Sequence, residues 1–300
     1  MPTFATPGPI SVRIDLPFGD TRIIASDRDT TVVDVLGDEH EVTRVACAGD
    51  EVTITAATTA SDRGLLGWGL GLLGIGADTD VSVTVEVPAG SRVQATTRYG
   101  SVSAEGRLDA CRISTTYGEV HLGETGSLEI RGGHGDITVE HVAGDAEITT
   151  SSGDVRVGVV EGAATITDKH SDVTVAEAMG ALQLRGTHGE VSVGRVLDGL
   201  LARNAYGGVR VDELVAGACD VATTYGEIEI GIAEGTAAWL DIGSDTGSVH
   251  NRLDEQPGPD AFDRTCEINA RTRDGDIVIR RARRPAEAKP RFWSVASTSR

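Results

Sequence analysis

The chain has 300 residues, and its 46 Asp and Glu outweigh 27 Lys and Arg, which gives a formal net charge of −19. So acidic a chain is a poor nucleic-acid binder, because phosphate contacts need Lys and Arg. The chain contains no run of 18 apolar residues, which a transmembrane helix would need. The first 22 residues lack the basic and apolar regions of a secretory signal. Four Cys are too few for a disulfide framework, and with no signal they predict a cytoplasmic protein with reduced thiols.

Residues 1–90 show strand patterns without the turn glycines of the later chain. Apolar residues alternate in five segments: 10–14, 21–24, 31–35, 51–55 and 81–85. We expect these segments to form irregular first coils or a β cap, because an uncovered end would expose strand edges to aggregation.

Residues 64–76, GLLGWGLGLLGIG, are apolar and uncharged. They contain G-x-G-x-x-G without the strand and helix that a dinucleotide site needs, and they are too short to cross a bilayer. We interpret them as a loop folded over one end of the molecule. The alternative is an exposed patch that contacts a membrane or a partner through Leu65, Leu66, Trp68, Leu70, Leu72 and Leu73.

Residues 91–280 carry a repeat of about 18 residues. A phrase such as Tyr117-Gly118-Glu119-Val120 recurs ten times, and a second glycine column, from Gly126 to Gly235, lies half a period away. Between the glycines, Val, Ile and Leu alternate with polar residues, which predicts strands rather than helices. Short strands that repeat in one chain with no helix between them stack in parallel, so we predict an all-β, single-stranded parallel β-helix (β-solenoid) with coils of about 18 residues.

The recurring G-[DE]-[VI]-x-[VI] phrase, the segment VSVTVEVPAGS (81–91) and the T-T-x-Y-G segments resemble the bacterial DUF4097 family, over about Ile10 to Arg280. The resemblance implies a parallel β-helix and an adhesin-like role. It carries over no catalytic residues.

One column of residues stands immediately before the turn glycines. Its ring-bearing members predict a stacked ladder, because adjacent coils lie ~4.8 Å apart; they are Tyr99, Tyr117, His134, His170, His188, Tyr206 and Tyr225. The residue after each glycine is usually acidic. Stacked carboxylates repel one another unless they are solvated or bridged by a cation. His170, Asp172, His188 and Glu190 are therefore the candidates for a metal site, with a solvated face as the alternative.

Two further columns bear on function. Thr97, Thr115, Thr150 and Thr223 recur at one position, but Gly132, Asp168, Gly186 and Asn204 interrupt them, which argues against an ice-binding ladder. Cys111 and Cys219 fall on the inward-facing side, six coils apart, so they cannot form a disulfide. Cys47 and Cys266 stand alone, and no C-x-x-C supports a zinc site.

Residues 281–300 are basic and contain Pro285 and Pro290, which indicates a disordered tail. The tail either keeps the chain soluble or contacts an anionic surface, such as a membrane or the acidic solenoid.

These observations predict a non-enzymatic, adhesin-like scaffold that presents a flat surface to a protein or a cell surface and needs no cofactor. Two alternatives stay open: a filament that assembles end to end like the bactofilins, and a cation-stabilised repeat like the calcium-binding RTX proteins. A carbohydrate enzyme would need a cleft, and the expansion at 251–264 is the only place for one. The ligand, the oligomeric state and the handedness of the helix are not encoded in any of these features.

Overall fold

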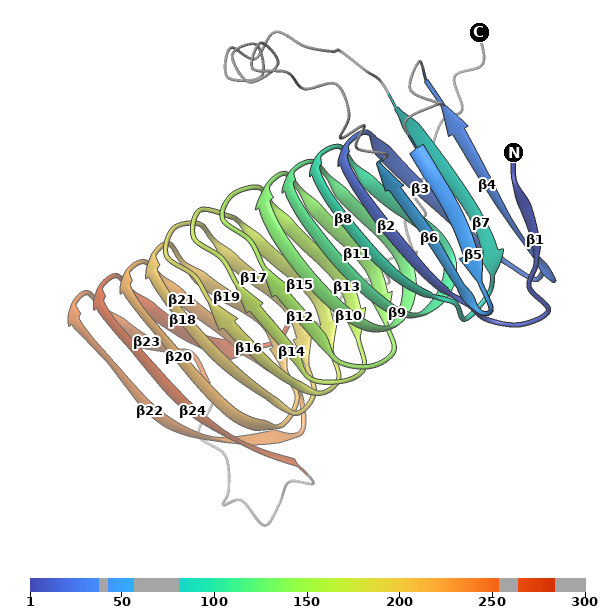
Figure 1. Ribbon diagram of the computed structural model, residues 1–300. Coiled ribbons are helices and arrows are strands. Elements are labelled where there is room, and N and C mark those ends of the chain that lie inside the picture. Colours follow the sequence, from blue (N-terminus) through green and yellow to red (C-terminus); the bar gives the residue numbers. More distant parts are fainter. Residues whose placement is uncertain (38–42, 57–80, 254–263, 284–300) are drawn as a thin grey trace, which may run out of the picture.

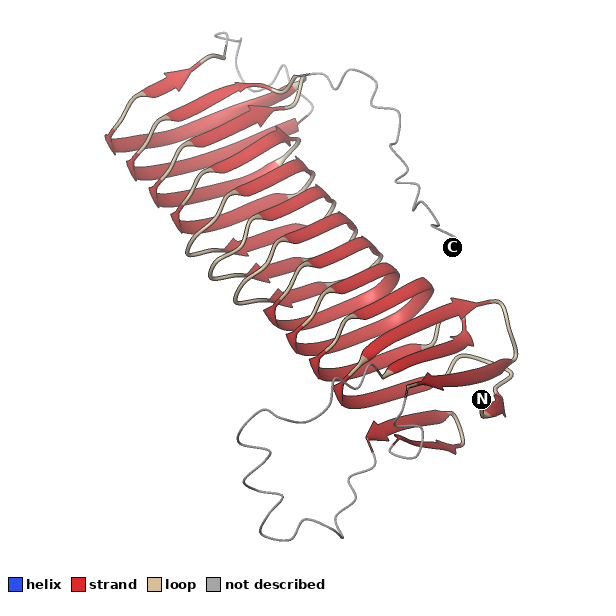
Figure 2. Ribbon diagram, turned by 90° about the horizontal axis from the view of Figure 1, so that it is seen from above, coloured by secondary structure: helices blue, strands red, loops and turns tan. Residues whose placement is uncertain are grey.

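The computed structural model describes residues 1–37, 43–56, 81–253 and 264–283. Over these ranges the chain forms strands and turns without a helix, and the strands wind into an elongated, flattened solenoid (Figures 1 and 2). The predicted all-β parallel β-helix is therefore confirmed. The apolar segment 64–76, most of the 251–264 expansion and nearly all of the basic tail lie outside the described residues.

Each regular coil has one strand that runs into a turn glycine and one strand that leaves it, and these two sets form the pre-turn face and the post-turn face. The pre-turn strands are β8 (Arg92–Tyr99), β12 (Ala146–Thr149), β14 (Ala164–Thr167), β16 (Ala181–Arg185), β18 (Gly199–Tyr206) and β20 (Gly217–Tyr225). The post-turn strands are β11 (Ile137–Val142), β13 (Val155–Val160), β15 (Val173–Ala178), β17 (Val191–Val196), β19 (Val209–Leu214) and β21 (Ile228–Ile232). The longer β9 (Val102–Tyr117) and β10 (Val120–His134) bend round the far corner and serve both faces.

The stacking is parallel and in register, so like residues lie above one another. On the pre-turn face Ile130 pairs with Ile148, Ile148 with Ile166, and Ile166 with Leu184. The inward positions of both faces form one buried apolar core from Ile10 to Ile279, in which Cys111 and Cys219 take part as expected. The period-two pattern of the sequence is thus the pattern of the core.

Glycine is required at the turn by close approach of the backbone. Gly118 has φ = +149°, and a Cβ there would collide with the carbonyl oxygen of Gly100 one coil away. Any other residue would need both an unfavourable φ and a wider coil spacing, which the hydrogen bonds between strands do not allow.

The N-terminal end departs from chain order. Strands β2 (Ser11–Phe18) and β3 (Asp20–Ser26) form a regular coil that pairs with β8 and β9, and Gly19 stacks on Gly100 in the turn column. The view that residues 1–90 lack the turn glycine is therefore wrong at Gly19. The 18-residue spacing does not reveal Gly19, because 81 residues of chain separate it from Gly100, on which it stacks.

Further strands cover the outer side of this first coil. Strands β6 (Glu51–Ala56) and β7 (Ser82–Pro88) pair with it in parallel. Strands β4 (Thr30–Leu36), β5 (Thr43–Ala48) and β1 (Thr3–Ala5) then add antiparallel. The end of the solenoid is thus a β cap in which the strand direction reverses.

The C-terminal end also exchanges its coils. Strands β24 (Arg264–Asp274) and β25 (Ile277–Arg281) pair with β20 and β21, while β22 (Thr236–Thr246) and β23 (Val249–Asn251) stack outside them. The last coil in sequence is therefore the penultimate coil in space. This insertion explains why the repeat spacing loosens to 21 and 28 residues after Gly226.

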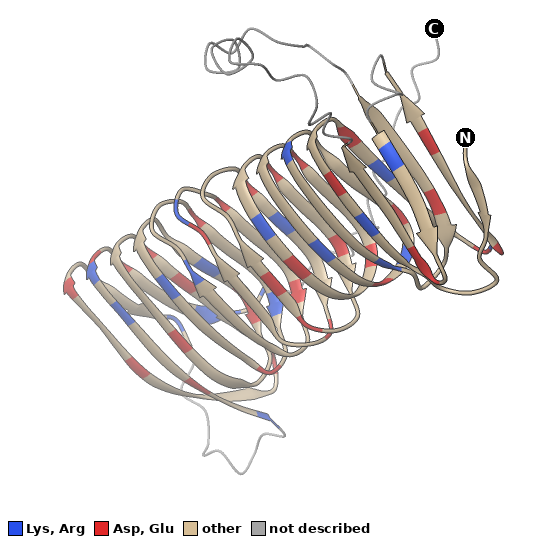
Figure 3. Cartoon of the chain, viewed as in Figure 1, with Lys and Arg blue, Asp and Glu red and all other residues tan. Residues whose placement is uncertain are grey.

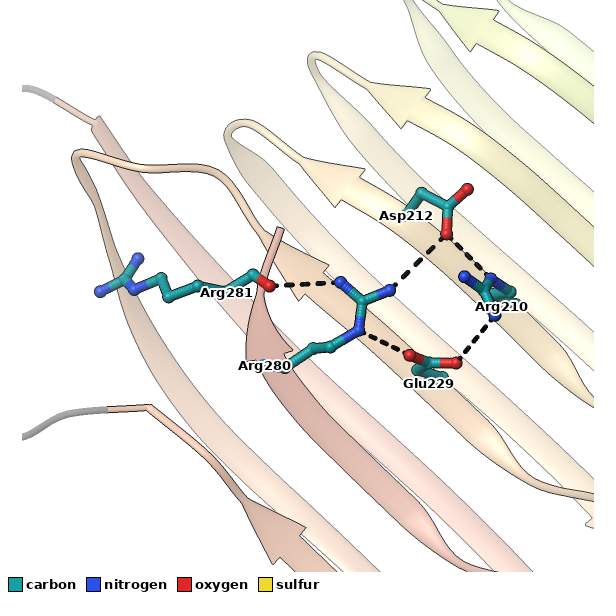
Figure 4. A network of polar contacts seen from close by, with 5 residues as sticks. All are labelled: Arg210, Asp212, Glu229, Arg280 and Arg281. Atoms are coloured by element: carbon teal, nitrogen blue, oxygen red, sulfur yellow. Dashed lines mark hydrogen bonds and ion pairs between the residues drawn. The ribbon is translucent and has the colours of Figure 1, made fainter. Parts of the chain in front are cut away.

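An ion-pair network fastens the inserted coil (Figure 4). The Arg280 guanidinium, whose side chain is 10% exposed, lies 2.5 Å from Glu229 and 3.7 Å from Asp212, and Arg210 contacts both of these acids. The hydrogen bond from Arg280 lowers the pKa of Glu229. The network joins β25 to β19 and β21, so it ties the inserted coil to strands that precede it by about 50 to 70 residues.

Candidate functional site: the turn ladder

The rings before the turn glycines stack as two continuous columns along one edge of the solenoid. In the first column the ring centroids are 5.4 Å (Phe18–Tyr99), 5.1 Å (Tyr99–Tyr117) and 5.0 Å (Tyr117–His134) apart. In the second they are 4.9 Å (His170–His188), 4.8 Å (His188–Tyr206) and 5.2 Å (Tyr206–Tyr225) apart. All interplanar angles are 10° or less. We call these eight ring residues the turn ladder.

The turn ladder is open to solvent. Its four Tyr are 42–48% exposed and Phe18 is 51% exposed. Half of the large, exposed hydrophobic side chains among the described residues belong to this one edge; the others are Met1, Leu36, Met179, Trp239 and Val249. Aromatic surface gathered in this way is characteristic of a contact surface.

Ser152 interrupts the ladder between its two columns. Bridges join His134 to Ser152 and Ser152 to His170, so the backbone register continues through the gap. Only the ring is missing. The rings of His134 and His170 therefore lie two strand spacings apart, ~9.6 Å, with no ring between them.

The carboxylates after the turn glycines have a structural role. Oδ1 of Asp136 accepts a hydrogen bond from the backbone N–H of Asp154 at 2.9 Å, and Oδ1 of Asp172 accepts one from Glu190 at 2.8 Å. Asp20 and Asp276 do the same at the two ends of the column. Each of these acids therefore satisfies a backbone donor of the neighbouring coil and helps to hold adjacent turns in register.

The metal candidates do not converge on one point. The rings of His170 and His188 are stacked face to face, so their nitrogen lone pairs lie in parallel planes, and one oxygen of Asp172 is engaged by the backbone. In the ranges that the structure covers, no group of three or more His, Cys, Asp and Glu could hold a metal ion. The arrangement of His170, Asp172, His188 and Glu190 is that of a stack with solvated acids.

A buried polar column lies just inside the turns. It holds the threonines that were considered for an ice-binding ladder, and these point inward: Thr97, Thr115, Thr150 and Thr223 are at most 7% exposed. Asp168 and Asn204 are buried in the same column, and their Oδ1 atoms lie within about 3 Å of the place where Gly186 would carry a Cβ. Loss of hydration raises the pKa of Asp168 to about 6.

The two faces carry charges of both signs (Figure 3), and several Arg form ion pairs with acids on neighbouring coils. Arg92 pairs with Asp109 at 2.9 Å, Arg112 with Glu129 at 2.6 Å, and Arg203 with Asp220 at 2.6 Å. A shallow groove of about 990 Å³ crosses the N-terminal part of the pre-turn face, where Arg13, Arg92 and Arg112 stand beside Glu51 and Glu129. Asp50, Asp145 and Glu147 line the same groove, so five acids face three Arg and the excess charge of the groove is negative.

Sequence reasoning missed two features of this edge and one of the core. Phe18 extends the ladder and Asp20 extends the carboxylate column, but both belong to a coil that chain order does not place beside Tyr99. The phrase Phe18-Gly19-Asp20-Thr21-Arg22-Ile23 has the ring–Gly–acid pattern and could have revealed it. Cys266, which stands alone in the sequence, lies on the inserted strand β24, where it is buried in the core and pairs with Gly217 of β20.

Comparisons with known proteins place this chain in a family. The Toastrack DUF4097 family model matches residues 11–289, so the chain belongs to this family. A search of curated proteins found no match.

Solved structures give weaker similarities. A protein from Bacteroides fragilis described as a "putative adhesin" is 8% identical, with 93% of this chain and 95% of that chain covered and a TM-score of 0.34. A "putative lipid binding protein" from Parabacteroides distasonis is 11% identical, with 94% and 96% covered and a TM-score of 0.30. At these TM-scores the similarities carry no inference about function. No helix among the described residues is long and apolar enough to cross a membrane.

Proposed function

We propose that this protein is a non-enzymatic, adhesin-like scaffold whose turn ladder is the surface that contacts a protein or cell-surface partner. The observation that carries the proposal is the row of stacked, solvent-exposed rings along one edge of a rigid solenoid.

The ladder suits binding because it is already ordered. Each ring stacks on at least one neighbour at about 5 Å, so little side-chain entropy remains to be lost when a partner covers it. Tyr offers a large contact area and a hydroxyl that can hydrogen-bond, which is why it is enriched at interfaces. The regular coils between Val102 and Ile232 hold this edge straight.

The titratable groups favour binding over catalysis. Asp168 has the raised pKa that a general acid would need, but it is 5% exposed and faces the interior, where no substrate reaches it. Among the exposed carboxylates beside the ladder, four Asp accept backbone hydrogen bonds from the neighbouring coil, and Asp154 pairs with Arg156 at 2.6 Å. These five carboxylates hold the turns in place rather than standing free as acids or bases.

The test compares two variants of the full chain. In the ladder variant Tyr99, Tyr117, Tyr206 and Tyr225 are replaced by Ser. In the matched control Met179 and Glu161, on the opposite edge, are replaced by Ser. Binding is measured by biolayer interferometry to intact bacterial cells, purified cell-wall glycans and phospholipid vesicles.

We expect the wild type and the control to bind at least one of these surfaces, and the ladder variant to bind it at least tenfold more weakly. Equal binding by the ladder variant would refute the role of the rings. A bound glycan or lipid whose mass changes during incubation would refute the non-enzymatic assignment.

A further inference from the structure

The two ends of the solenoid are finished differently. At the C-terminal end, β22 and β23 pair on one side only within the described residues, with β24 and β25. We call β22 and β23 the C-terminal edge. It is the outermost coil at the end opposite the N-terminal cap in Figure 1.

The apolar core is uncovered at this edge. One coil inward, Ile268 and Ile277 are fully buried. Their stacking partners are not: Leu240 is half-buried and Val249 is 42% exposed, although both occupy inward positions. Trp239 on the same strand is 63% exposed. The interior of the solenoid thus ends in apolar side chains without a covering layer in the part of the chain that the structure describes.

The backbone of this edge is also suited to pairing. β22 spans 11 residues, contains neither Pro nor Lys, and has only Asp241 and Asp245 as charged residues. The outermost described strands at the other end are short, with three residues in β1 and six in β5, and they run antiparallel to their neighbours. Short edge strands are one way in which proteins prevent edge-to-edge association, and a long edge strand with few charges invites it.

We propose that the C-terminal edge binds a second copy of this chain, by antiparallel pairing of β22 with β22 of the partner around a two-fold axis. A two-fold contact uses the same surface on both copies, so it closes after one addition. A filament would need a second open end, and the short antiparallel strands of the cap do not supply one. The inference goes beyond the proposed function, because it holds whether or not the turn ladder binds a partner.

The sequence of β22 selects the register. Inward residues must face inward residues for the core to continue, which places the two-fold axis at an inward position. An axis at Leu240 sets Leu240 opposite its own copy, Ala238 opposite Ile242, and Trp239 opposite Asp241. An axis at Asp241 would instead oppose two carboxylates, which is unfavourable.

The contact is small. Eleven residues at ~3.4 Å and a core ~10 Å thick give an apolar strip of about 370 Å² on each copy, to which the strand edges add. The sum lies near the lower limit of specific interfaces, so we expect a reversible dimer that half-forms at roughly 1–100 µM.

Sedimentation velocity of the full chain over 1–300 µM tests the association. We expect a shift from monomer to dimer and no larger species. Leu240→Lys should raise the half-dimerisation concentration at least tenfold, whereas Met179→Lys, at an exposed apolar site away from the edge, should not change it. A monomer at every concentration, or growth beyond the dimer, would overturn the proposal.

Cross-linking tests the register without relying on the Lys variant. In a Cys47→Ser background, which removes the exposed thiol, Leu240→Cys should form an intermolecular disulfide on mild oxidation, because opposed antiparallel residues have Cα atoms ~4.5–5.5 Å apart. Ser244→Cys, on the same strand and face, should not, since its copy would lie eight residues away along the paired strand. Equal cross-linking of both variants would refute the register. Dimerisation only after removal of residues 284–300 would show that the chain's own tail occupies the edge, and would refute the second copy.

Discussion

Filling the gap in the turn ladder should stabilise the protein. Ser152 stands in register between His134 and His170. Because Ser has no ring, the sides of these two imidazoles that face each other have no stacking partner. In the variant Ser152→Tyr, the new ring enters a column whose spacing and tilt are already set by rings on both sides.

The magnitude follows from two new stacked pairs. Each is worth ~0.5–1.5 kcal/mol, and ordering the Tyr side chain costs about 1 kcal/mol. The net gain in the free energy of unfolding is therefore about 1 kcal/mol, or a rise of ~2 °C in Tm for a chain of this size.

Thermal unfolding followed by circular dichroism measures this change. Ser151→Tyr is the matched control, because it adds the same ring one residue off the ladder. In a His134→Ser background the new ring forms one stacked pair instead of two, and the ~1 kcal/mol of that pair is offset by the ~1 kcal/mol of ordering. Ser152→Tyr should therefore give almost no gain over His134→Ser alone. A Ser152→Tyr protein that melts no higher than the Ser151→Tyr control would refute the view that stacking stabilises this edge.

Four further outcomes are expected. The pKa of Asp168 is raised from about 4 to about 6, so as the pH rises the unfolded state loses this proton before the folded state does. The contribution of protonated Asp168 to stability is therefore present below about pH 4 and is lost as the pH rises through 6. Asp168→Asn should raise Tm relative to wild type at pH 8 but not at pH 4, and equal shifts at both pH values would contradict the assignment. Arg280→Met leaves Glu229 without its main partner and should lower the free energy of unfolding by about 1–2 kcal/mol, with faster hydrogen exchange confined to β24 and β25; uniform loss of protection would contradict a local fastening role. Gly118→Ala should lower stability by at least ~2 kcal/mol, measured by urea unfolding, whereas Gly8→Ala, which has open space around it, should be nearly neutral. Because Asp136 and Asp172 already serve backbone donors, Tm should be the same in calcium and in chelator, and a fall in chelator would revive the cation-stabilised alternative.

The local pattern was sufficient to predict the regular coils. The 18-residue spacing, the turn glycines and the alternation of Val and Ile determine strand length, turn position and the inward face, because all three depend on a residue and its nearest repeats. The stacking of Tyr206 on Tyr225, for example, follows from spacing alone.

The spacing of the ring–Gly–acid phrase predicts the stacked rings, but it does not predict the role of the acids. Spacing shows that Asp136 and Asp154 approach each other, which suggests repulsion or a cation. Only the geometry shows that a carboxylate oxygen of Asp136 reaches the backbone N–H of the next coil. That bond depends on the turn conformation, which positive φ at glycine sets and which the residue types alone do not report.

The sequence by itself determined the solenoid, its period and the edge on which the rings lie. The tertiary structure alone decided the order of the coils at both ends, where Gly19 lies against Gly100 and β24 inserts between β20 and β22. The physical reason is that neighbouring coils present nearly the same apolar face and hydrogen-bonding edge, so several stacking orders satisfy the local pattern. The choice among them falls to contacts between residues far apart in the chain, such as the network of Arg280 with Glu229 and Asp212.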